Sequence, residues 1–283
     1  MGMLIYDALV LSKAAQQIVE RKSCLTLGVP TLNFKDEHFL HHWSTHPDLK
    51  DTNIGKQPFD TAAGFFHNLG FDNISALDIS DYEGADVIAD LNDPDLPQKI
   101  GRQFDVVYDS GTLEHIFDAP SAMRSIAQLV RIGGIVVHAT PSNGFLDHGF
   151  WQISPDLYRT FYKKAGFEVL TSSLFVFAES PYAMPAEQNL YRTHGRQYIT
   201  EMAPEAILVF AARKTHEGNL GPISMQEYYS HMHADASAET KAHFFLKFGE
   251  MPEPNRVISK SAGTPRSNDT ISALLSRFGV RKR

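Results

Sequence analysis

The chain has 283 residues, of which 43% are hydrophobic, and a formal net charge of −7. This length suffices for one large α/β domain with additional segments, and no apolar run reaches the roughly 18 to 20 residues that a membrane-spanning helix needs. The negative charge disfavours a nucleic-acid partner, which requires a basic surface. The single cysteine, Cys24, excludes an internal disulfide and a thiolate metal cluster, so we expect a cytoplasmic protein.

The first part of the chain predicts a helix, a strand and an insertion. Residues 1–22 resemble an amphipathic helix, and Asp7 within their apolar part argues against a secretory signal. We expect the main domain at residues 23–214, beginning with a strand at 23–28. An irregular insertion or lid is expected at 29–58, because this stretch has few periodic apolar positions.

Strands and helices then alternate as far as residue 139. We predict helices at 59–69, 94–101 and 119–131, one strand that ends at Asp78, and further strands at 86–90, 104–109 and 134–139. Such alternation favours right-handed crossovers and a parallel sheet.

The remainder of the chain predicts a final helix and two strands, followed by an extension. Ser154 and Pro155 are typical of a helix start, and Gly166 of its end. The strands at 167–177 and 205–214 are expected to pair as an antiparallel hairpin with a long connection. Residues 215–283 form the predicted extension, partly flexible, with expected helices at 224–233, 238–248 and 271–278.

Polar residues close four of the predicted strands: Asp78, Asp90, Asp109 and Thr140. In an open α/β sheet the ligand binds beyond the carboxyl ends of the strands, so these residues are expected to meet at one rim. The sequence therefore predicts a binding rim for a nucleoside-like ligand.

Four motifs, ALDIS, IADLN, FDVVYDSGTLEHI and GGIVVHATP, resemble those of class I S-adenosylmethionine-dependent methyltransferases. The resemblance extends over residues 23–214, and LDISDYEGADVIADLN, DSGTLEHIFD and HGFWQISPDLY also resemble a bacterial subgroup of that family. It implies an α/β fold with a Rossmann-like, seven-stranded, mostly parallel sheet and helices on both faces.

The resemblance also implies S-adenosylmethionine as cofactor and gives roles to the residues of the rim. Asp78 would accept hydrogen bonds from the ribose hydroxyls, and Asp90 with Leu91 would face the adenine. The implied cofactor residues are Gly28, Asp78, Ile79, Asp90, Leu91 and Asp109. Asp at strand ends also commonly caps the following turn, which is the alternative for Asp78 and Asp90.

The first turn departs from the family pattern. The family has a GxGxG turn after the first strand, whereas this chain has LGVPTLN, in which Val29 adds a side chain and Pro30 lacks an amide donor. The same absence disfavours a dinucleotide-dependent dehydrogenase. Three functions stay open: a methyltransferase acting on a small-molecule or saccharide-like acceptor, an S-adenosylmethionine-binding enzyme with non-methylating chemistry, and a non-catalytic binding module.

Asp109, Glu114 and His115 follow the fourth strand, where the resemblance implies methyl transfer, and they are the predicted catalytic residues. His115 is predicted as a general base, and Glu114 as the group that orients an amine or hydroxyl. The alternative is that Glu114 and His115 only cap the next helix.

The loop after the fifth strand contains the predicted substrate contacts His148 and Trp151, with Thr140 at the end of that strand. Aromatic faces in this loop suit a planar or sugar substrate, or cation–π contact with a sulfonium. The alternative is a loop packed by its own side chains.

Histidine is abundant, with 13 residues in the chain. Those outside the predicted rim include His41, His42, His46, His231 and His233. No spacing matches a recognised metal motif such as H-E-x-x-H, so we expect no metal. The predicted partner is a small-molecule substrate, without nucleic acid or membrane, and the sequence leaves the oligomeric state open.

Overall fold

The computed structural model describes residues 2–45, 58–176, 190–192, 205–223 and 225–226, all within one compact unit, Met1–Pro252. In chain order the elements are α1 (Ile5–Ala15), β1 (Ser23–Leu27), α2 (Asp36–Thr45), α3 (Ala62–Asn68), β2 (Asn73–Asp78), β3 (Val87–Ile88), α4 (Leu96–Ile100), β4 (Phe104–Ser110), a 3₁₀ turn (Leu113–His115), α5 (Ala119–Leu129), β5 (Val130–Asn143), α6 (Pro155–Lys164), β6 (Phe167–Val176), β7 (Leu190–Arg192) and β8 (Ala206–Lys214).

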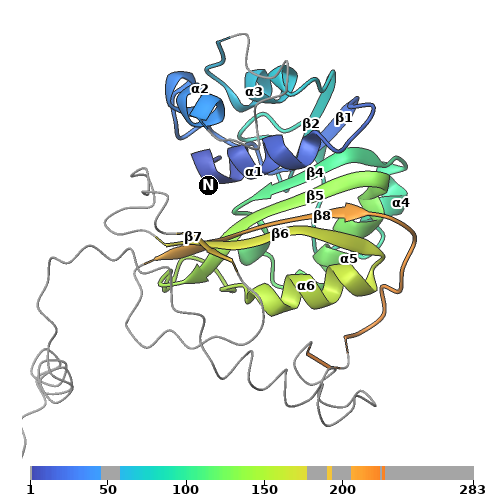
Figure 1. The fold of residues 1–283 in the computed structure, drawn as a ribbon. Helices are drawn as coiled ribbons and strands as arrows, with labels where there is room; N and C mark the ends of the chain where they lie inside the picture. Colours follow the sequence, from blue (N-terminus) through green and yellow to red (C-terminus); the bar gives the residue numbers. More distant parts are fainter. Residues whose placement is uncertain (1, 46–57, 177–189, 193–204, 224, 227–283) are drawn as a thin grey trace, which may run out of the picture. The chain divides into compact units, whose positions relative to one another are not determined.

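These strands form one sheet in the order β3-β2-β1-β4-β5-β8-β6-β7 (Figure 1). Pairing is parallel from β3 to β5, and β8 is antiparallel to both of its neighbours, β5 and β6. The predicted α/β, Rossmann-like fold class and the late antiparallel hairpin are therefore confirmed. The three-residue β7 pairs antiparallel with β6 and adds an eighth strand at the edge.

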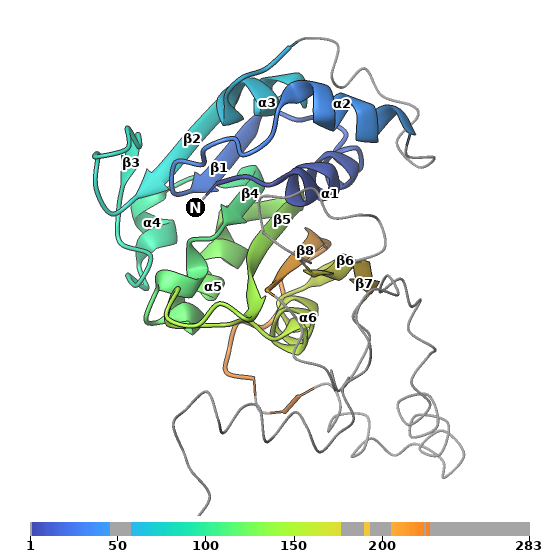
Figure 2. The same cartoon turned by 90° about the vertical axis from the view of Figure 1, so that its left-hand side faces the viewer.

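Helices cover both faces of the sheet, as predicted (Figure 2). Alternate residues of each strand point to opposite faces, so neighbouring positions enter different cores. Val106 of β4 packs in the core beneath α1 and α3, whereas Val107 packs in the core beneath α5 and α6. Strands that are buried on both faces explain the nearly continuous apolar runs in the sequence.

The predicted irregular insertion at 29–58 contains a helix, α2, in its described part, and residues 46–57 lie outside the described residues. Phe39 of α2 is completely buried, with its ring centroid 5.2 Å from that of Phe65 in α3. Phe34 and Phe59 join this aromatic cluster. The sequence did not predict α2 because this segment packs against the core mainly through a few aromatic side chains. It lacks the regularly spaced apolar residues that indicate a helix.

Some of the other predicted helices have different bounds in the structure, and others fall on residues that the structure does not describe. α3 begins at Ala62 because the Thr61 hydroxyl accepts a hydrogen bond from the amide of Gly64. The helices expected at 238–248 and 271–278 lie outside the described residues, and so does the one expected at 224–233 except for residues 225–226, which are not helical. Among the described residues, no helix has both the length and the apolar character to span a membrane.

The amino-terminal segment is attached to the loop after β1. Met3 forms a parallel bridge with Leu32, and its amide donates to the Thr31 carbonyl at 2.7 Å. In α1, Asp7 is buried and accepts hydrogen bonds from the Tyr108 and Ser110 hydroxyls of β4, at 2.5 and 3.0 Å. The segment therefore lies beside the carboxyl end of β4 and the loop after β1.

Candidate functional site

The carboxyl ends of β1 and β2 meet at a corner with no side chain at Gly28. Gly28 has a φ of +75°, a left-handed conformation that favours glycine. A Cβ atom there would lie 3.1 Å from Thr112 Oγ1 and 3.9 Å from Asp78 Oδ2. The Thr112 hydroxyl donates to the Leu27 carbonyl at 2.7 Å, which holds the loop after β4 against this corner. The corner thus places a glycine backbone and a carboxylate side by side, with Thr112 packed closely against the glycine.

The two predicted ligand carboxylates of the rim also cap turns. Asp78 is half-buried and accepts a hydrogen bond from the Ser80 amide at 3.3 Å. Asp90 is exposed and accepts from both the amide and the side chain of Asn92, each at 2.8 Å. The capping alternative therefore describes both residues, and one oxygen can cap a turn while the other accepts from a ligand. Their cofactor roles stay predictions.

The apolar residues predicted beside these carboxylates differ in exposure. Ile79 is 67% exposed at the rim, whereas Leu91 is buried in the core beneath α4 and α5. Ile79 is therefore placed to contact a ligand, and Leu91 contributes mainly to packing.

Asp109 is completely buried, and its two oxygens bind in different directions. Oδ1 accepts from the Thr112 and Leu113 amides at 2.9 and 3.3 Å. Oδ2 lies 2.7 Å from His138 Nδ1, and the other nitrogen of that ring lies 2.6 Å from the Tyr162 hydroxyl. Asp109 thus holds the loop that carries Glu114 and His115; direct contact with cofactor or substrate stays a prediction.

Glu114 follows on the 3₁₀ turn, with a side chain that is completely buried. Neither of its carboxyl oxygens has a hydrogen-bond partner among the described residues. Burial, with a contribution from the charge of Asp109, raises the pKa of Glu114 to about 8. A buried polar group without partners is costly and uncommon in native proteins, so this carboxyl requires an explanation.

Two imidazoles lie beside the Glu114 carboxyl. Nε2 of His115 is 3.9 Å and Nε2 of His148 is 3.8 Å from Glu114 Oε1, and the centroids of the two rings are 5.2 Å apart. Burial, followed by the neighbouring His148, lowers the pKa of His115. The helix-capping alternative is wrong, because Asp118 caps α5 by accepting from the Ser121 amide at 3.1 Å.

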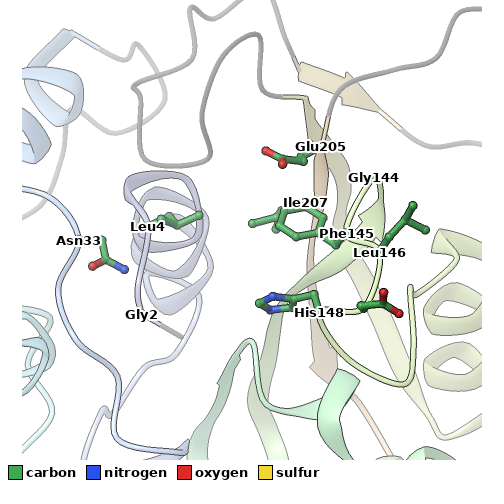
Figure 3. A pocket seen from close by; sticks show the side chains of 10 residues that line it. Gly2, Leu4, Asn33, Gly144, Phe145, Leu146, His148, Glu205 and Ile207 are labelled. Carbon is green, nitrogen blue, oxygen red and sulfur yellow. The ribbon is translucent and has the colours of Figure 1, made fainter. Parts of the chain in front are cut away.

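A cavity of about 420 Å³ opens beside His148. It is bounded by the amino-terminal segment, the loop after β1, the loop after β5 and the start of β8, through Gly2, Leu4, Asn33, Gly144, Phe145, Leu146, Asp147, His148, Glu205 and Ile207. Figure 3 shows the His148 ring directed toward the amino-terminal segment. The sequence predicts His148 as a substrate contact, but it carries no signal that residues 2–4 lie near this side chain.

The other predicted substrate residues lie outside this lining. Thr140 is buried, with its hydroxyl 3.2 Å from that of Tyr158. Trp151 is partly exposed, and its indole nitrogen donates to the Ile116 carbonyl at 2.9 Å. Both residues hold the loops around the site, and substrate contact by either stays a prediction.

No protein-family model and no curated protein matches the chain. Similar solved structures include TehB from Haemophilus influenzae, with 12% identity, a TM-score of 0.41, and coverage of 74% of this chain and 62% of TehB, less than two thirds. The N-methyltransferase NodS from Bradyrhizobium japonicum, in complex with S-adenosyl-L-homocysteine, has 8% identity, a TM-score of 0.41 and coverage of 75% and 87%. A SAM-dependent methyltransferase from Archaeoglobus fulgidus has 11% identity, a TM-score of 0.40 and coverage of 73% and 92%.

Proposed function

We propose that this protein is an S-adenosylmethionine-dependent methyltransferase that acts on a small-molecule or saccharide-like acceptor. The observation that carries the proposal is the corner at Gly28, in a sheet of order β3-β2-β1-β4-β5-β8-β6-β7. There a glycine with positive φ adjoins the Asp78 carboxylate, which is 3.9 Å from the position that a Cβ atom would occupy. Ligands of such sheets bind beyond the carboxyl ends of the strands, next to the point where the strand order reverses.

The residues at the corner fit this cofactor. Asp78 would hold the ribose hydroxyls as a charged hydrogen-bond acceptor, and Ile79 and Asp90 would lie toward the base. Gly28 supplies backbone without a side chain beside Asp78, and a Cβ there would lie 3.1 Å from Thr112 Oγ1. When bound, the cofactor supplies an electrophilic methyl group. The protein must then align an acceptor with it and receive a proton.

The cavity beside His148 is the proposed acceptor site. Its lining combines the apolar side chains of Leu4, Phe145 and Ile207 with the polar groups of Asn33 and Glu205. Such a mixture suits a small molecule that has an apolar body and a few polar groups. His115 adjoins the lining residue His148, and its lowered pKa keeps its ring neutral and able to accept a proton near neutral pH.

Isothermal titration with S-adenosylmethionine and with S-adenosylhomocysteine tests the cofactor site. Asp78→Ala is expected to weaken binding by about 1.5 to 3 kcal/mol, the value of hydrogen bonds to a charged group. Asp81→Ala is the matched control, because it removes an exposed carboxylate three positions away. If the wild type and a folded Asp78→Ala variant bind with equal affinity, Asp78 is not part of the site. If the wild type does not bind at millimolar ligand, the result favours a non-catalytic binding module.

His115→Gln separates binding from turnover. If His115 accepts a proton, the variant keeps cofactor affinity and loses turnover. Equal losses of both would give His115 a structural role. Product analysis in the same assay distinguishes methyl transfer, which releases S-adenosylhomocysteine, from non-methylating chemistry that releases methylthioadenosine.

A further inference from the structure

The Glu114 carboxyl and the two adjacent imidazoles form a cluster that hydrogen bonding does not account for. Separations of 3.8 and 3.9 Å between Oε1 and the Nε2 atoms are too long for hydrogen bonds. The ligand atoms of Glu114, His115 and His148 nevertheless all lie within 4.8 Å of one another. Three donors therefore converge on one point, and one of them is a buried carboxyl without a partner among the described residues.

We propose that Glu114, His115 and His148 bind a divalent transition-metal ion. Around a tetrahedral ion with bonds of ~2.1 Å the donor atoms lie ~3.4 Å apart, so the carboxyl and each imidazole need to approach by roughly 0.5 Å, and donor atoms as far apart as 4.8 Å by about 1.4 Å. The ion would give the Glu114 oxygens the partner that they lack. The site shares His115 and the adjoining cavity with the proposed methyl-transfer site, so with the ion bound His115 would be a ligand and not a proton acceptor. Binding of the ion is tested without any assay of activity.

The donor set indicates which ions fit. Two imidazoles and one carboxylate are ligands of Zn²⁺ in sites with an open fourth position, and of Fe²⁺ in sites with several open positions. Mg²⁺ and Ca²⁺ prefer oxygen ligands alone. The proposed site thus favours Zn²⁺ or a similar ion over the hard cations.

The loop that carries His148 is held directly against Glu114. The Phe150 and Trp151 amides both donate to the Glu114 carbonyl, at 2.8 and 3.2 Å. Gly149 packs so closely that a Cβ there would lie 2.8 Å from the same carbonyl oxygen and 3.0 Å from Glu114 Cγ. These contacts fix the distance between His148 and Glu114 through the backbone, as a preorganised ligand set requires.

The position of the cluster indicates what the ion would bind. His148 belongs to the cluster and also lines the 420 Å³ cavity. Open coordination positions would therefore face a molecule in that cavity, and an oxygen or nitrogen donor of that molecule would complete the coordination. Sequence spacing led us to expect no metal; the site arises because the fold brings His148 beside Glu114 across 33 intervening residues.

The test is isothermal titration of tag-free, chelator-treated protein with ZnCl₂, followed by the same titration with MgCl₂. Three variants are compared with the wild type: Glu114→Gln, His148→Ala and His38→Ala. His38 is the matched control, because its Nε2 also lies 3.9 Å from a carboxylate, that of Glu37, but both groups are exposed. Thermal unfolding of each variant verifies that it is folded, and Co²⁺ serves as a visible-absorption probe of the ligand set.

We expect one equivalent of Zn²⁺ to bind with micromolar or higher affinity and Mg²⁺ to bind at least 100-fold more weakly. Glu114→Gln and His148→Ala are each expected to weaken Zn²⁺ binding at least 30-fold and to abolish the Co²⁺ spectrum, whereas His38→Ala retains both. Absence of stoichiometric Zn²⁺ binding by the wild type would overturn the proposal. Retention of wild-type affinity in either folded ligand variant would also overturn it.

Discussion

Two buried carboxyl groups, Asp105 at the amino end of strand β4 and Glu114 on the turn beyond its carboxyl end, have opposite surroundings. At the amino end, Asp105 accepts from the Lys22 and Ser23 amides at 2.9 and 2.6 Å and from Arg131 at 2.5 Å. Beyond the carboxyl end, both oxygens of Glu114 lack hydrogen-bond partners among the described residues. Asp105 thus stabilises the fold, whereas the turn after β4 retains an unsatisfied carboxyl near the rim where ligands are expected to bind.

The pKa values of Asp105 and Glu114 shift in opposite directions, in keeping with their different surroundings. Burial by itself would raise the pKa of Asp105, but hydrogen bonds from the two amides and from Arg131 outweigh it and lower the pKa. At Glu114 burial prevails, and the pKa rises to about 8. A group whose pKa falls on folding stabilises the fold above its unfolded-state pKa, whereas a group whose pKa rises loses its stabilising effect as the pH increases.

The largest effect is expected from Asp105→Ala. The substitution leaves Arg131 and two backbone amides without their acceptor, which is expected to lower the free energy of unfolding by about 3 kcal/mol. Urea denaturation measures it. Glu168→Ala is the control, because it breaks an exposed pair with Arg213, 2.6 Å long, and is expected to cost less than about 1 kcal/mol. Similar losses in the two variants would show that the amino end is not a special source of stability.

A second effect concerns Asp7, a buried carboxyl with hydroxyl partners. Burial raises the pKa of Asp7 to about 7, so its contribution to stability is complete below its unfolded-state pKa of ~4 and is lost as the pH rises toward 7. Burial also raises the pKa of Tyr6 and of Tyr108, which keeps both neutral in this range.

Asp7→Asn, which cannot ionise, is expected to remove this pH dependence. Between pH 5 and pH 7 the wild type should lose about 2 kcal/mol relative to the variant. Denaturation at the two pH values, with wild type and variant side by side, provides the measurement. Parallel pH profiles would mean that Asp7 has the same pKa in the folded and unfolded chains.

A smaller effect of opposite sign is expected at Glu114. In chelator-treated protein, Glu114→Met replaces an unsatisfied carboxyl by an apolar side chain of similar length and is expected to stabilise the fold by about 1 kcal/mol. Thermal unfolding measures the gain. A loss of stability comparable to that of Asp105→Ala would contradict the contrast between the two ends of β4.

The smallest expected change in stability is that of Gly28→Ala. A positive φ costs an alanine about 1 kcal/mol. Gly84→Ala provides a matched control, because Gly84 has a φ of +85° and no atom within 4 Å of the position that a Cβ would occupy. Gly28→Ala should lose at least as much stability as Gly84→Ala, because its Cβ would also lie 3.1 Å from Thr112 Oγ1, and only Gly28→Ala should weaken S-adenosylmethionine, measured by titration. Equal cofactor affinities would exclude the Gly28 corner from the binding site.

Strong local signals in the sequence predicted much of the fold. Apolar β-branched runs that end at Asp78 and Asp109 correspond to β2 and β4, and the helix start at Ser154 and Pro155 is that of α6. These features were predictable because a strand buried on both faces has consecutive apolar residues, and a helix start has characteristic residues at adjacent positions. The three-residue β7 and the helix α2 lack such signals.

By itself, then, the sequence determined the order of strands and helices and the polar residues at the strand ends. Only the tertiary structure decided which of those residues meet. It turned Asp109 inward to His138, and it brought His148 to Glu114 and the amino-terminal segment to the cavity. Contacts between residues far apart in the chain depend on how loops pack, and neither the period of a strand nor a spacing motif encodes that packing.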